Sequence, residues 1–120
     1  MGLTHVTVRM SSLSGNGEAY EAECLVDTGA VDCMAPADQL RMVGIKPEGR
    51  AVYELASGEP VEYEYGFARV EFIGSTTVAQ VVFGPADTEP ILGVAALENA
   101  GIMVDPVNKT LKRLPAKPLK

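Results

Sequence analysis

The residues with the clearest chemical potential are Asp27, Thr28 and Gly29, which directly follow the apolar pair Leu25-Val26. An apolar strand that ends in this way places the Asp27 carboxylate at the edge of the hydrophobic core. Burial penalises the ionised form of a carboxylate, so such a group needs partners. Thr28 offers a hydroxyl on a stiff side chain, and Gly29 lets another chain or a substrate approach the backbone closely. The segment is therefore a candidate site of carboxylate chemistry, with an ordinary turn as the alternative.

Other residue types that support catalysis or metal binding are scarce. The chain has one histidine, His5, so a histidine-based metal cluster is excluded. Cys24 and Cys33 lie nine positions apart, which matches no zinc or redox spacing, and we expect both to be buried free thiols. The segment Gly15-Asn16-Gly17 predicts a hairpin turn rather than a phosphate-binding loop. We therefore expect neither a metal nor a cofactor.

Length and charge exclude several classes of function. The chain has 120 residues, which is the size of a single domain and leaves no room for a second lobe. We expect this domain to span residues 1–115, with a short basic tail over 116–120. The net charge of −6 disfavours binding to nucleic acid. No apolar run approaches the roughly 20 residues of a membrane span and no signal peptide is recognised, so we expect a cytoplasmic protein with no membrane partner.

The hydrophobic periodicity predicts a mainly β domain, built as a barrel or a curved sheet. Turn residues separate the strands, and the segment 56–60 marks the tip of a hairpin. Two short helices are expected, over 36–43 and 94–99, with Gly44 and Gly101 as their C-terminal stops. The expected strands, about eight in all, cover residues 3–10, 19–26, 51–55, 61–65, 67–73, 76–83, 102–104 and 110–114.

Three segments together resemble the retropepsin-like aspartic proteases, the group that contains the retroviral proteases. The segment Leu25-Val26-Asp27-Thr28-Gly29-Ala30 resembles their active-site sequence. Ile91-Leu92-Gly93 resembles the hydrophobic-hydrophobic-Gly element that precedes a short helix in that family. The hairpin 51–65, with Ser57-Gly58 at its tip, falls where the family has its flap. The run from Gly93 to Pro106 is particularly similar to cellular members from bacteria and archaea.

This resemblance implies a closed or curved β-barrel lobe with a flap hairpin, active as a homodimer. Asp27 would be the catalytic residue, paired with its twofold mate to activate a water that hydrolyses an extended peptide substrate. Thr28 would bond across the dimer interface, and Gly29 and Ala30 would support the active site and the dimer contact. The flap residues over the substrate would be Leu55, Ala56, Ser57 and Gly58.

Some positions stay open or depart from the family pattern. Val31, Ile91 and Leu55 are candidates for subsite walls, with a purely core role as the alternative. Retroviral members usually carry Arg where this chain has Val94, and often an acid where it has Val31. Because those two positions tend to form an ion pair in the family, the loss of both is self-consistent. The catalytic triplet is untouched.

The shortness of the chain makes the homodimer a requirement of the proposed chemistry. Peptide hydrolysis by this route needs two carboxylates that share one proton, and the chain supplies one Asp-Thr-Gly. Four other acids, Asp32, Asp38, Asp87 and Asp105, are interpreted as turn, cap or surface residues. The alternatives are a non-catalytic retropepsin-like domain for dimerisation or peptide binding, and an inert β-domain with an accidental triplet.

Overall fold

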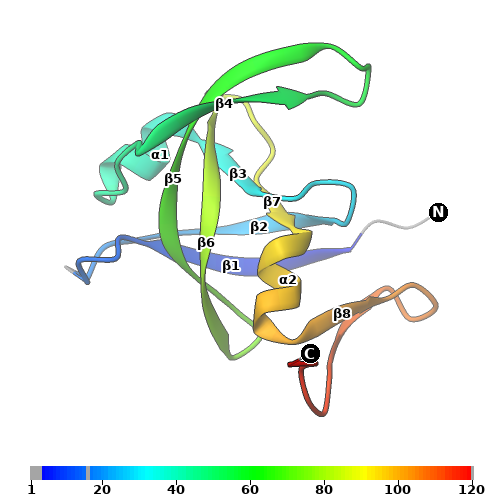
Figure 1. Ribbon diagram of the computed structural model, residues 1–120. Helices are drawn as coiled ribbons and strands as arrows, with labels where there is room; N and C mark the ends of the chain where they lie inside the picture. The colour runs from blue at the N-terminus through cyan, green and yellow to red at the C-terminus, as the bar shows by residue number, and fades with distance from the viewer. Residues whose placement is uncertain (1–3, 16, 120) are drawn as a thin grey trace.

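The computed structural model describes residues 4–15 and 17–119, and within them nine strands and two helices form. The chain is mainly β, with 52% strand and 11% helix, and six strands close into a barrel. The mainly β class and the barrel are thus confirmed (Figure 1). The elements are β1 (His5–Ser11), β2 (Ala19–Asp27), β3 (Cys33–Pro36), α1 (Ala37–Met42), β4 (Gly49–Glu54), β5 (Pro60–Phe72), β6 (Ser75–Gly84), β7 (Ile91–Gly93), α2 (Val94–Ala100), β8 (Ile102–Asp105) and β9 (Thr110–Arg113).

The barrel closes because β5 pairs with β1 as well as with its sequence neighbours. The strand order is β1-β2-β7-β3-β6-β5, and β5 returns to β1. The short strand β7 lies between β2 and β3, parallel to β2 and antiparallel to β3. The sequence pattern does not predict β3 or β7 as strands, because four and three residues are too few to display an alternation.

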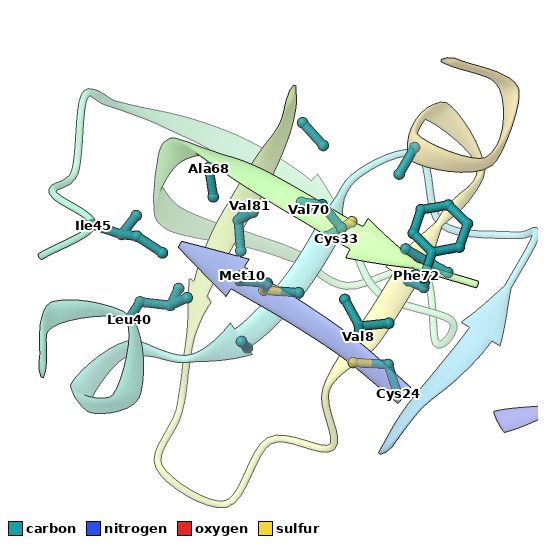
Figure 2. Packing of buried hydrophobic residues seen from close by; sticks show 14 of the residues in the cluster. Val8, Met10, Cys24, Cys33, Leu40, Ile45, Ala68, Val70, Phe72 and Val81 are labelled. Carbon is teal, nitrogen blue, oxygen red and sulfur yellow. The ribbon is translucent and has the colours of Figure 1, made fainter. Parts of the chain in front are cut away.

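Alternating side chains fill the barrel interior. In β1, Val8 and Met10 are buried, whereas His5, Thr7 and Arg9 are exposed, as the period-2 pattern predicts. Figure 2 shows buried side chains of β1, β2, β3, β5 and β6 meeting in one cluster. The buried hydrophobic residues are Val8, Met10, Cys24, Cys33, Ala35, Leu40, Ile45, Ala68, Val70, Phe72, Ala79, Val81, Val82, Phe83, Leu92, Ala96, Leu97 and Ile102.

One long strand, β5, replaces the two strands expected over 61–65 and 67–73. The chain continues extended through Gly66, where an added Cβ would lie 2.4 Å from the carbonyl oxygen of Lys46. Gly66 therefore permits a close backbone approach rather than a break. The first half of β5 pairs with β4 and the second half with β1. The β4–β5 hairpin consequently extends beyond the barrel, as the green strands at the top of Figure 1 show.

Both expected helices form, and the C-terminal segment packs against the second. Leu40 of α1 is fully buried, and Gly101 ends α2 with a left-handed φ of 73°. Strands β8 and β9 form a separate two-stranded sheet. The tail residues 116–119 are exposed, and Lys117 donates a hydrogen bond to the carbonyl of Asn99 at 2.7 Å. Expectations on Leu3, Asn16 and Lys120 lie outside the described residues.

Within the described part of the chain, no helix is both long and apolar enough to span a membrane. The two cysteines are free and buried, as predicted. Burial raises the pKa of Cys24 to about 12 and that of Cys33 to about 11.

Both thiols should therefore resist modification in the folded protein. At pH 8 we expect a thiol reagent to label neither cysteine rapidly in the native state and both in denaturant, because the reactive thiolate is suppressed by burial. The absorbance of the chromophore that the reagent releases measures how many cysteines have reacted. Fast labelling of either cysteine in the native protein would contradict the described core.

Candidate functional site

Asp27 is the last residue of β2 and lies beside Gly93, with which it pairs in the parallel β2–β7 ladder. The Asp27 carboxylate accepts a hydrogen bond from the backbone N–H of Gly29 at 2.9 Å. The N–H of Ala30 donates to the Asp27 carbonyl at 3.1 Å. The triplet thus forms a tight turn that holds a partly buried carboxylate at the end of β2.

The loop after this turn is fixed to the start of α2. The N–H of Val94 donates to the carbonyl of Ala30 at 2.8 Å, and that of Ala95 donates to Val31 at 3.1 Å. The first turn of a helix leaves backbone N–H groups without partners inside the helix, and α2 has no side-chain cap. The loop carbonyls take the place of that cap, so loop and helix stabilise each other.

Gly93 makes this contact possible. A Cβ at position 93 would lie 2.4 Å from the carbonyl oxygen of Asp32 and 2.7 Å from that of Val31. Such separations are far below van der Waals contact, so only glycine fits while the loop keeps its place. This is the physical reason for a glycine at the end of the Ile91-Leu92-Gly93 element.

A groove of about 670 Å³ lies between this loop and the β4–β5 hairpin. Its floor is the outer face of the barrel, where Met34 pairs with both Val82 and Ile91. The loop side and the hairpin side of the groove face each other across this floor. The lining residues are Asp27, Gly29, Ala30, Val31, Asp32, Met34, Val52, Tyr53, Glu54, Leu55, Ala56, Tyr63, Val82 and Ile91.

Asp32 is a groove residue that the sequence interpretation missed. Its Oδ2 accepts hydrogen bonds from the Tyr53 hydroxyl at 2.9 Å and from Gln80 Nε2 at 3.1 Å. Asp32 lies in a bend of the loop before β3, as expected of a turn residue, but distant elements supply the partners of its side chain. The sequence did contain a signal for this role: Asp32 is a polar residue that follows the triplet and the apolar pair Ala30-Val31.

The other three acids behave as surface or turn residues. Asp105 accepts hydrogen bonds from Asn108 and from the backbone N–H of Val107, and the bonds from Asn108 are the main cause of its lowered pKa. Asp38 and Asp87 are exposed. Among the described residues, no group of three or more His, Cys, Asp and Glu side chains is placed to hold a metal ion.

Most of the predicted site residues gather around the groove. Thr28, Ser57 and Gly58 do not line it: Thr28 is exposed and makes no side-chain hydrogen bond within residues 4–15 and 17–119, and Ser57 and Gly58 lie at the exposed hairpin tip. Val31 and Leu55 are 67% and 37% exposed, so neither is a core residue. The predicted residues that line the groove are Asp27, Gly29, Ala30, Val31, Leu55, Ala56 and Ile91.

The strand end before Asp27 is less buried than expected. Leu25 and Val26 are only partly buried, and Cys24 is the fully buried residue of β2. The side chain of Val26 packs against the barrel cluster. Asp27 has the same intermediate burial as these two residues.

Comparison with known proteins identifies no family, since no family model and no curated protein matches the chain.

Replacing Gly93→Ala should disturb the loop and lower stability. The added Cβ meets backbone oxygens that cannot move independently, so we expect a loss of about 1–3 kcal/mol in the free energy of unfolding. Urea denaturation measures it. Gly49→Ala is the matched control, because its Cβ meets only the far end of the Tyr65 side chain. Equal losses of unfolding free energy in the two variants would contradict the close approach of the loop backbone to Gly93.

Proposed function

We propose that the protein is an aspartic endopeptidase of the retropepsin-like type, active as a homodimer. The observation that carries this proposal is the position of Asp27. Its carboxylate faces a groove with an apolar floor and a hairpin opposite, and the Gly29 N–H holds one of its oxygens. A carboxylate at such a site is accessible to water and substrate while its orientation is fixed.

The chemistry needs a second carboxylate close to the first. Within the described residues, the other acids that line the groove are Asp32 and Glu54. Asp32 is already bonded to Tyr53 and Gln80, and Glu54 belongs to the hairpin. Neither is the first residue of an Asp-Thr-Gly turn, so a twofold mate of Asp27 is the partner we propose.

Two such carboxylates would share one proton, because like charges this close cannot both ionise. The ionised Asp27 takes a proton from a water as the water oxygen attacks the scissile carbonyl carbon. The protonated Asp27 of the other chain gives its proton to the carbonyl oxygen. When the C–N bond breaks, the Asp27 that took the water's proton gives it to the leaving amine nitrogen. A hydroxyl of the tetrahedral diol gives its proton to the other Asp27 as the product carboxyl forms, which restores the singly protonated pair.

An extended peptide suits the shape and lining of the groove. Leu55 and Ala56 border it from the hairpin, and Gly29 borders it from the loop. A substrate strand between these two segments can bond to backbone groups on both sides, with its side chains against Met34 and Ile91. In this proposal the hairpin tip at Ser57 and Gly58 acts as the flap over the substrate.

Asp27→Asn should abolish cleavage while preserving shape. We expect cleavage of a mixed peptide library, followed by mass spectrometry from acid to neutral pH, to fall at least about 100-fold. Asp38→Asn is the matched control, because it neutralises an exposed carboxylate on α1. Undiminished cleavage by D27N would overturn the assignment. A wild-type protein that binds peptides without cleaving them would favour the non-catalytic alternative.

The chain should also be a dimer under the conditions of cleavage. Sedimentation velocity at micromolar concentration and at the active pH should give the mass of two chains, because one chain supplies half of the site. Cleavage by a species that sediments as a monomer would contradict the shared-site proposal.

A further inference from the structure

A hydrogen-bond network joins the hairpin to the loop behind Asp27. The Tyr53 hydroxyl donates to Asp32 Oδ2 at 2.9 Å, and Gln80 Nε2 donates to the same oxygen at 3.1 Å. Gln80 Nε2 also lies 3.3 Å from the Tyr53 hydroxyl oxygen. The three side chains come from β4, β6 and the loop before β3, so the network connects elements that are far apart in the sequence.

The Asp32 end of the network is a fixed anchor. The Asp32 carbonyl lies over Gly93, and the neighbouring Val31 carbonyl accepts the N–H of Ala95. All three bonded atoms are partly buried, where hydrogen bonds to a carboxylate are stronger than between neutral groups. Burial raises the pKa of Tyr53, so its hydroxyl remains a donor at neutral pH.

The rest of the hairpin near its tip is held mainly by local bonds. The N–H of Leu55 donates to Glu59, and that of Gly58 donates to Leu55. The ion pair of Arg50 with Glu62 joins the two strands of the hairpin to each other. Strand β4 pairs with β5 alone. The ion pair of Arg41 with Glu64 joins the base of the hairpin to α1 at 2.9 Å. Nearer the tip, within the described residues, the Tyr53 network is the side-chain hydrogen-bond link from the hairpin to the rest of the domain.

We propose that Tyr53 is a positioning residue that holds the hairpin at a fixed distance from the loop across the groove before a substrate binds. Asp32 and Gln80 supply the acceptor and the supporting donor. A preformed groove lowers the ordering cost of binding an extended peptide. We call this link from Tyr53 to Asp32 and Gln80 the tether. It is inferred from the hydrogen bonds alone, whereas its effect on catalysis rests on the proposed function.

Hydrogen exchange tests the tether without any assumption about activity. In Tyr53→Phe we expect backbone amides of residues 50–62 to exchange at least about fivefold faster, because the bond to Asp32 is lost. Tyr63→Phe is the matched control: Tyr63 lies beside Tyr53 with ring centroids 6.3 Å apart and lines the same groove. Its hydroxyl makes no hydrogen bond within the described residues. Equal exchange in the two variants, or no change in Y53F, would overturn the tether.

A double-mutant cycle separates the tether from a general loosening of the fold. Asp32→Ala should accelerate the same amides, and the double variant Y53F/D32A should add little beyond either single change. Amides of β1 and β2 should be unaffected and report an intact barrel. Additive effects of the two changes would show that Tyr53 and Asp32 act independently, which would overturn the proposal.

Kinetics then shows whether the tether serves the proposed reaction. We expect Y53F to raise KM for a peptide substrate at least about threefold and to change kcat less than about twofold. The reason is that the hairpin of the variant occupies the binding-competent position for only a fraction of the time, which lowers the apparent affinity. An unchanged KM alongside faster exchange would overturn the positioning role. If the wild type cleaves no peptide, the proposed function fails, while hydrogen exchange still decides the tether.

Discussion

The close crossing of the loop 30–32 over Gly93 is the constraint on which the rest of the site depends. The absence of a side chain at Gly93 lets loop carbonyls reach the first N–H groups of α2. That contact fixes the direction in which the chain leaves Asp27, and it fixes Asp32 as an anchor for Tyr53. The Asp27 carboxylate, the loop and the hairpin are therefore all linked to this one backbone contact, the hairpin through the bond from Tyr53 to Asp32.

The barrel topology brings the two halves of this contact together. Strand β7 lies between β2 and β3 although about 60 residues separate it from either. The parallel pairing aligns Asp27 with Gly93, and the buried interior behind them supplies a rigid support. The length of β5 adds the hairpin, because its first half extends beyond the strands that close the barrel. A groove then forms between a fixed loop and a tethered hairpin.

The sequence predicted the parts of the site that depend on local patterns. The strand ending at Asp27, the hairpin over 51–65, the stop at Gly101 and the buried cysteines all follow from periodicity, turn chemistry or composition. The break expected between 61–65 and 67–73 is wrong, because Gly66 permits a close backbone approach and does not end the strand. The partners of Asp32 lie 21 and 48 positions away, and only the closed barrel brings them together.

In the proposed function, the Asp27 of one chain supplies half of an acid–base pair, and the Asp27 of a second chain supplies the other half. Mixing wild-type and D27N chains at constant total concentration, with time for subunit exchange, tests this claim most directly. If both carboxylates are required, activity follows the square of the wild-type fraction, and an equal mixture retains about one quarter of it. A linear decrease, with about one half retained, would show that each chain works alone and would contradict the shared site.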